Sequence, residues 1–156
     1  MIADAIKLAK EALVKPFEGY ARRLPDGSCK AYPDPATGGA PWTIGWGCTG
    51  RGIDETTVWT AAQADIALDL ELHHFADALL KYSPRLLLAS DRRLAALISF
   101  AYNCGIGNYR VSTLKRRVDA EDWQGAAEQI VRWNKANGRV MRGLTRRREA
   151  EAAFLR

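Results

Sequence analysis

Residues 31–35, AYPDP, and residues 42–50, WTIGWGCTG, form the stretch that decides the fold of this 156-residue chain. Six glycines punctuate the region between residues 38 and 52, and glycine tolerates positive φ and close packing of the backbone. This composition favours short irregular strands over a regular helix. The stretch carries a carboxylate at Asp34 and a hydroxyl at Thr43, with a second carboxylate upstream at Glu18. We therefore expect a small β lobe that presents polar groups.

The rest of the chain has the periodicity of helices. Residues 3–16 predict an amphipathic helix that ends at Pro16 to Gly19, with Glu18 just past it. The β lobe would span residues 20–52, and a helical lobe would span residues 56–156. The first predicted helix of that lobe is capped by Thr56 or Thr60 and runs to about Tyr82. A central core helix follows, which begins at Ser90 or Asp91 and ends between Asn103 and Gly107. Three more helices are predicted: a short basic helix that begins at Ser112, one that begins at Glu121 or Asp122 and runs through Trp133, and one from Thr145 through Phe154.

These elements predict an α+β fold in one domain, residues 1–156. The N-terminal helix joins the helical lobe, and we expect a ligand to lie in a cleft between the two lobes. The first fifteen residues contain five charged side chains, so we expect no signal peptide or membrane span there. We accordingly expect synthesis in the cytoplasm, with export provided by something else.

The three cysteines, Cys29, Cys48 and Cys104, have no CxxC spacing, and the only histidines are the adjacent pair His73 and His74. A zinc site is therefore not expected, and neither a metal nor a cofactor is predicted. Cys29 and Cys48 could form a disulfide outside the cytoplasm, although a small buried thiol is the simpler expectation for Cys48.

The formal net charge is +5, and the excess lies in the last third of the chain. Residues 106–156 contain twelve Lys or Arg against six Asp or Glu. Such a balance favours a polyanionic partner, which could be a nucleic acid, an anionic lipid or an acidic cell-wall polymer.

One Glu and one Asp in different settings are what glycoside hydrolysis requires. One carboxylic acid must protonate the leaving oxygen, and an ionised carboxylate must assist the attack. Glu18 and Asp34 supply the pair. Thr43 adds a hydroxyl that can hold a water, since no neighbouring base activates it as a nucleophile.

Several segments, in order along nearly the whole chain, resemble the phage-type lysozymes, the endolysins of glycoside hydrolase family 24. The segments that carry the resemblance are Glu18-Gly19, Tyr32-Pro33-Asp34, Thr43-Ile44-Gly45-Trp46-Gly47, Thr49-Gly50, the run from Ala95 to Gly105, Ser112-Thr113-Leu114, Arg132-Trp133-Asn134-Lys135 and the run from Gly143 to Glu149.

The resemblance implies a lysozyme-like fold and a muramidase that hydrolyses the β-1,4 bond between N-acetylmuramic acid and N-acetylglucosamine in peptidoglycan, with inversion, and so lyses the host cell. It implies that Glu18 is the general acid, Asp34 the second carboxylate and Thr43 the hydroxyl that positions water. Tyr32, Asn103 and Arg146 are the implied substrate-binding residues, and Arg146 is expected to approach Glu18. A monomer that needs a holin for access to the wall is also implied.

The chain departs from the family pattern in two places. Fifteen residues separate Glu18 from Asp34, and eight separate Asp34 from Thr43, so both gaps are longer than usual. Asp26 is therefore a rival for the second carboxylate, although Pro25-Asp26-Gly27 is typical of a hairpin turn. Cys48 stands where the family commonly has histidine.

Two other functions compete with hydrolysis. A lytic transglycosylase needs only one acid/base residue and closes the sugar on itself, whereas the presence of Asp34 and Thr43 favours hydrolysis. A cationic module that binds nucleic acid or the cell envelope could use Lys115 to Arg117 and Arg146 to Arg148, which otherwise predict a solvated face. The chain has no recognised DNA-reading pattern, so we expect no nucleic-acid partner but allow contact between the basic C-terminal region and an anionic envelope.

Overall fold

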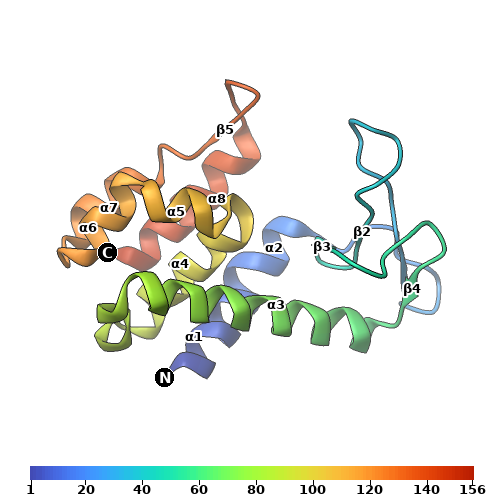
Figure 1. The fold of residues 1–156 in the computed structure, drawn as a ribbon, viewed down its shortest axis with the longest axis horizontal. Coiled ribbons are helices and arrows are strands. Elements are labelled where there is room, and N and C mark those ends of the chain that lie inside the picture. The colour runs from blue at the N-terminus through green and yellow to red at the C-terminus, as the bar shows by residue number, and fades with distance from the viewer. The chain divides into compact units, whose positions relative to one another are not determined.

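The computed structural model describes all residues from 1 to 156 and divides into two compact units (Figure 1). The helical unit consists of Met1–Phe17 and Leu72–Arg156, and the β unit consists of Glu18–Glu71. Two helices, α2 (Lys15–Glu18) and α3 (Ala61–Tyr82), contain the points where the chain passes between the units.

Helix α4 (Asp91–Cys104) is the core of the helical unit, as the sequence predicts. All eight residues from Leu94 to Ala101 are buried, and helices α1 (Ile2–Leu8) and α8 (Arg142–Leu155) pack against it. Ser90 caps its N-terminus by accepting a hydrogen bond from the Arg93 N–H. Gly105 follows its last residue with φ of 87°, a conformation that suits glycine.

Two more predicted caps are confirmed in the helices that follow. The side chain of Ser112 caps α6 (Thr113–Asp119), and the side chain of Asp122 caps α7 (Trp123–Ile130). Helix α7 is shorter than predicted, because the chain turns after Ile130 instead of continuing to Trp133. The 3-10 helix η2 (Pro84–Leu88) and helix α5 (Ile106–Val111) were not predicted.

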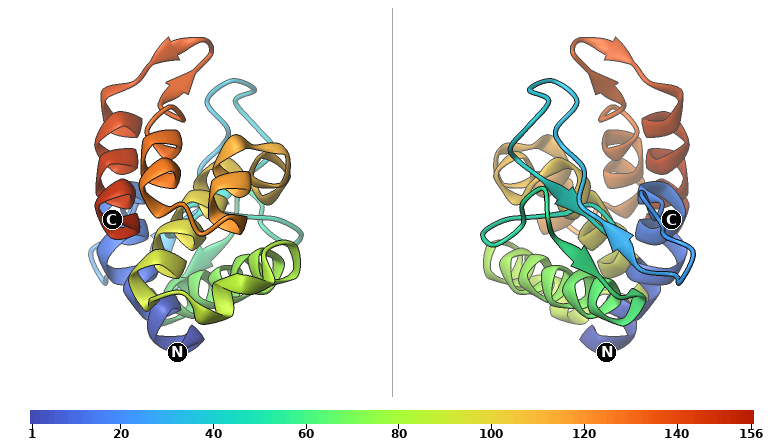
Figure 2. Two further views of the ribbon diagram at one scale, coloured as in Figure 1. Left: turned by 90° about the vertical axis from the view of Figure 1, so that its left-hand side faces the viewer. Right: turned by 90° about the vertical axis from the view of Figure 1, so that its right-hand side faces the viewer.

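A short hairpin of β5 (Lys135–Ala136) and β6 (Arg139–Val140) was also missed, and it projects beyond the helices of its unit (Figure 2). Asn137 and Gly138 join its strands, and both have positive φ. An Asn-Gly pair with these dihedrals is the preferred two-residue hairpin turn, so the local signal was present in the sequence.

The N-terminal helical segment is longer than predicted. It continues from α1 through the π-helical segment η1 (Ala9–Val14) into α2, so Pro16 does not end it and Glu18 is its last residue. Pro16 therefore lies inside a continuous helical segment, two residues after the last π-helical residue, Val14. Gly19, with φ of 71°, ends the segment.

Helix α8 begins at Arg142, three residues before the predicted start, and the expectation of a solvated arginine face is wrong. Arg147 and Arg148 are buried together with Glu151, at 3%, 0% and 0% exposure. These residues share one side of the helix because they are spaced by three and four positions.

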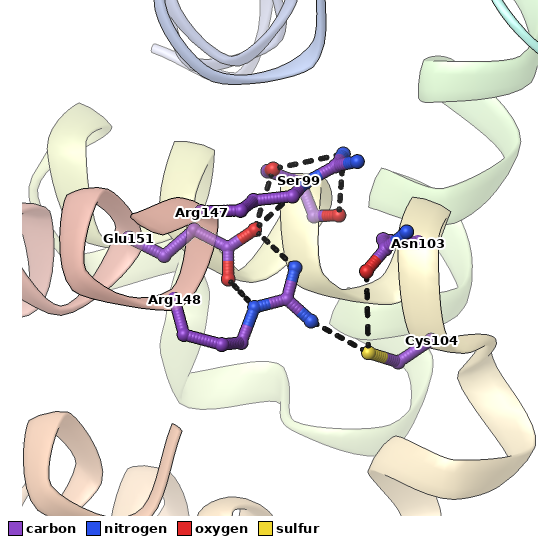
Figure 3. Close-up of polar contacts among 6 residues, drawn as sticks. All are labelled: Ser99, Asn103, Cys104, Arg147, Arg148 and Glu151. Atoms are coloured by element: carbon purple, nitrogen blue, oxygen red, sulfur yellow. Dashed lines mark hydrogen bonds and ion pairs between the residues drawn. The ribbon is translucent and has the colours of Figure 1, made fainter. Parts of the chain in front are cut away.

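A buried ion cluster results, which we define as Ser99, Arg147, Arg148 and Glu151 (Figure 3). The Glu151 carboxylate lies 2.8 Å from Arg148 Nε and 3.4 Å from Arg147 Nε. Arg148 Nη2 and the Ser99 hydroxyl both donate to Glu151 Oε1, at 2.9 and 2.7 Å. Because Ser99 is on α4, the cluster joins α8 to the core helix.

The β unit contains two small antiparallel strand pairs. Strand β1 (Cys29–Lys30) pairs with β4 (Val58–Trp59), and β2 (Thr43–Ile44) pairs with β3 (Cys48–Thr49). The lobe predicted to end at residue 52 therefore extends to Trp59. The buried side chains of Cys29, Ala31, Ile44 and Ala64 form its core.

Thr60 caps α3, as one of the two predicted alternatives. The Thr60 hydroxyl accepts from the Gln63 N–H at 3.1 Å, and the Gln63 side chain accepts from the Thr60 N–H at 2.8 Å. This reciprocal pair is a capping box, which fixes the start of the helix. No helix of the chain is both long enough and apolar enough to cross a membrane.

We predict that Glu151→Gln destabilises the fold by about 3 to 5 kcal/mol, because two buried guanidinium groups would lose their only shared counter-charge. Urea unfolding followed by circular dichroism measures the loss. Glu149→Gln is the matched control, since Glu149 is exposed on the same helix and its change should stay within about 0.5 kcal/mol. Equal effects of the two substitutions would show that the ion cluster contributes no particular stability.

Candidate active site

Glu18 is half-buried at the end of α2, where the helical segment meets the β unit. The positive φ of Gly19 turns the chain immediately after it. The side chain therefore projects from a fixed helix end and not from a flexible loop, contrary to the predicted position just past the helix.

Tyr32 and Thr43 are paired directly across a short antiparallel ladder. Each donates its backbone N–H to the carbonyl of the other, at 2.8 and 2.9 Å. Residues opposite each other in such a ladder have their side chains on the same face. The Tyr32 phenol and the Thr43 hydroxyl, both half-buried, thus belong to one surface of the β unit.

The charge of Glu18 affects the pKa of the Tyr32 phenol. Burial raises the pKa of the Tyr32 phenol above its ordinary value, and the negative charges of Glu18 and then Cys48 add to the shift. Glu18 and Tyr32 both belong to the β unit.

Asp34 is half-buried and organises the turn that follows it. Its Oδ1 accepts hydrogen bonds from the Ala36 and Thr37 N–H groups, at 2.7 and 3.1 Å. Its own N–H donates to the Gly39 carbonyl, and its carbonyl accepts from the Gly38 N–H. Both side-chain bonds end on Oδ1, so the second carboxylate oxygen stays outside this turn.

Asp26 lies in a hairpin turn, which confirms that interpretation of Pro25-Asp26-Gly27. Its Oδ1 accepts from the Ser28 N–H at 2.9 Å and from the Ser28 hydroxyl, and these bonds lower the pKa of the exposed carboxyl. Arg23 and Cys29 pair across the same turn. The Asp26 carboxylate therefore has its hydrogen-bond partners within the turn.

Cys29 and Cys48 are both free and buried, so no disulfide joins them. Cys48 faces Ile44 across the hairpin of β2 and β3, which Gly45 and Gly47 close with positive φ. The expectation of a small buried thiol at Cys48 is confirmed.

The remaining predicted residues are in the helical unit. Asn103 is exposed at the end of α4 and lines a pocket of about 420 Å³, together with Cys104, Trp133 and Lys135. Arg146 is exposed on α8. The expected approach of Arg146 to Glu18 stays a prediction.

Cys104 connects this pocket to the buried ion cluster, a link that was not predicted. Arg148 Nη1 donates to the Cys104 thiol at 2.7 Å, and the thiol donates to Asn103 Oδ1 at 3.7 Å (Figure 3). Burial raises the pKa of Cys104, and the Arg148 charge opposes that rise. The helical spacing of Leu144, Arg148 and Glu151 could have indicated that the arginines face inward.

The β unit thus contains Glu18, Tyr32, Asp34 and Thr43, with Tyr32 and Thr43 paired and Asp34 two residues beyond Tyr32. A carboxyl on a helix end, a second carboxylate in a tight turn and a hydroxyl on the ladder are groups that can transfer a proton and hold a water. No group of three or more His, Cys, Asp or Glu side chains is arranged to hold a metal ion.

Comparison with known proteins gives consistent results. The phage lysozyme family model matches residues 16–151. The endolysin of Bacillus phage B103 is 34% identical over 142 residues, which cover 89% of this chain and 49% of that protein. The chain therefore spans about half the length of this relative.

Solved structures have the same fold. The muramidase domain of SpmX from Asticaccaulis excentricus matches with a TM-score of 0.75 and 28% identity, over 97% of this chain and 93% of that one. The endolysin from Escherichia coli O157:H7 phage FAHEc1 matches with the same score and identity, over 97% and 90%. The fold is lysozyme-like α+β, and the chain belongs to the phage lysozyme family.

Proposed function

We propose that the protein is a muramidase of the endolysin type, which hydrolyses the β-1,4 bond between N-acetylmuramic acid and N-acetylglucosamine in peptidoglycan and so lyses the host cell. The observation that carries the proposal is the presence of Glu18 and of the paired Tyr32 and Thr43 in one unit of a chain of the phage lysozyme family. The names of similar proteins, endolysin and muramidase domain, support the same reaction.

In this proposal Glu18 is the general acid that protonates the leaving glycosidic oxygen. Its position at the end of α2 supports the role, because a helix end holds a side chain more firmly than a loop does. Asp34 is the second carboxylate. Its Oδ1 is engaged by the turn, which leaves Oδ2 to accept a hydrogen bond from the attacking water.

Thr43 completes the arrangement by orienting that water. Its backbone is fixed by two hydrogen bonds to Tyr32, so the hydroxyl has a defined position on the ladder. A water between the acid and the carboxylate attacks the anomeric carbon from the face opposite to the leaving oxygen. The reaction then inverts the anomeric centre and requires a carboxyl separation of roughly 6.5 to 9.5 Å.

Three residues are proposed to bind the glycan. Tyr32 would contact the sugar beside Glu18, Asn103 would bind through the pocket that it lines, and Arg146 would contribute a charge. The exposed cations of the β5–β6 hairpin, Lys135 and Arg139, would add contact with an anionic envelope.

The site of action in this proposal is the bacterial cell wall. The enzyme would be made in the host cytoplasm, act as a monomer and reach peptidoglycan after a holin-type lesion opens the membrane. A lytic transglycosylase and a nucleic-acid-binding module are the competing functions. Asp34 and Thr43 favour hydrolysis over the first, and the family match favours an enzyme over the second.

We predict that Glu18→Gln lowers the turnover of purified, protein-free peptidoglycan by at least about a hundredfold, since general acid catalysis typically supplies that factor or more. The release of new reducing ends measures turnover. Glu128→Gln is the control, because Glu128 is exposed on α7, and an unchanged melting curve would exclude unfolding. Retained lysis by Glu18→Gln would show that the catalytic assignment is wrong.

Asp34→Asn and Asp26→Asn form a matched pair that identifies the second carboxylate. Asparagine keeps the side-chain oxygen that each turn requires, so both variants should fold. We expect Asp34→Asn to lose about a hundredfold or more in turnover and Asp26→Asn to keep most of it. The reverse result would assign the role to Asp26.

The products should distinguish hydrolysis from transglycosylation. We predict reducing N-acetylmuramic acid ends that are initially in the α configuration, because inversion converts a β bond to an α product. Mass spectrometry gives the chemical form of the ends, and NMR of fresh products gives the anomer. Ends that are lighter by one water and closed into an anhydro ring would refute the hydrolase assignment.

A further inference from the structure

The β unit has a second pocket that none of the proposed catalytic residues lines. Its volume is about 670 Å³, and the residues that line it include Arg22, Lys30, Trp42 and Glu55. The exposed Val58 on β4 contributes an apolar wall. A pocket with an aromatic ring and a few converging charged groups is typical of a ligand site.

The ladder separates this pocket from the catalytic residues. Tyr32 and Thr43 are paired, so their side chains share a face, and their neighbours Pro33 and Trp42 point to the opposite face. Pro33 and Trp42 both line the pocket. The pocket therefore lies across the ladder from the Tyr32 and Thr43 side chains.

The backbone brings the two cations together. The Lys30 N–H donates to the Arg22 carbonyl at 3.1 Å, which fixes the two residues side by side. Arg22 has φ of 54°, a left-handed conformation that is uncommon for any residue except glycine and that tends to occur at functional positions. Both side chains are exposed, and neither forms an ion pair within the protein. They are available to an anionic ligand.

Trp42 provides a fixed apolar surface beside these charges. The indole is half-buried and packs against the core of the β unit, so its orientation is set before any ligand binds. The C–H face of a pyranose ring packs well on an aromatic ring, and the indole offers the largest such surface. Glu55 can accept hydrogen bonds from hydroxyl or amide groups of a bound sugar.

We infer that this pocket is a second peptidoglycan-binding site, which takes a muramic acid unit together with its stem peptide. The sugar lies on Trp42, and a carboxylate of the stem pairs with Arg22 and Lys30. Glu55 favours this ligand over a phosphate polymer, because its negative charge would repel a run of phosphates while it can pair with the amino group of a diamino acid in the stem. The inference rests on the proposed function. The site would hold a glycan strand away from the bond that is cut.

Binding of the full chain to purified wall tests the inference. In a Glu18→Gln background, which stops cutting, Arg22→Gln/Lys30→Gln should bind phosphate-free, stem-bearing glycan strands about tenfold more weakly, because two charge-assisted contacts are lost. The control is Arg23→Gln/Arg51→Gln, which removes the same charge from exposed positions in the same unit. The control should bind within about twofold of the parent.

Two further substrates identify the ligand. On strands whose stem peptides have been removed by an amidase, the parent should bind as weakly as Arg22→Gln/Lys30→Gln. Equal binding of the parent and this double variant to stem-bearing strands would overturn the inference, and so would a difference that is present only when wall phosphate polymers are retained.

A separate assay keeps this test independent of the proposed function. With Glu18 intact, Arg22→Gln/Lys30→Gln should cut short stem-free glycans at the parent rate and intact wall more slowly. If Glu18→Gln still cut the wall, the catalytic assignment would fail. The binding comparison could then be repeated at low temperature and would still show whether the second site binds the glycan.

Discussion

The helical unit depends on one buried carboxylate. Glu151 is fully buried between two guanidinium groups that are themselves almost inaccessible, and it accepts a hydrogen bond from Ser99 on the core helix. Removing three charges from water costs several kcal/mol per ion, so the arrangement persists only because the charges compensate one another at short range. The guanidinium group of Arg147 also lies 6.0 Å from the centre of the Phe17 ring. A single cluster therefore connects α8, α4 and the end of the N-terminal helical segment, and the next residue along the chain is Glu18.

The two units stabilise their charged side chains in different ways. The helical unit buries its charges and pairs them, whereas the β unit keeps its carboxylates near the surface and uses backbone N–H groups to hold them. The first solution fixes helices relative to each other. The second engages only one oxygen of each turn carboxylate, since the side-chain bonds of Asp26 and of Asp34 end on Oδ1.

Local chemistry explains why much of the fold could be predicted. Ser90, Ser112 and Asp122 cap helices through bonds that span three residues, and such signals are visible in the sequence. The turn at Asp26 is equally local. The buried arginines have no such capping signal, because their burial depends on Ser99 and Glu151, and a run of three arginines ordinarily faces water. The helical spacing of Leu144, Arg148 and Glu151 was the one available signal. Pro16 predicted the end of the first helix, but the helical segment continues through it to Glu18.

The sequence motifs name the candidate site residues, and the roles of these residues stay predictions. The motifs supplied Glu18, Tyr32, Asp34 and Thr43, while the bridge between Tyr32 and Thr43 follows from pairing across an intervening loop. That loop is closed at its base by Asp34 itself, through bonds to Ala36, Thr37, Gly38 and Gly39. Residues can be added or removed at the tip of such a loop without displacing the carboxylate that anchors it. The length of the loop between Asp34 and Thr43 can therefore vary without changing the backbone hydrogen bonds that hold the Asp34 carboxylate.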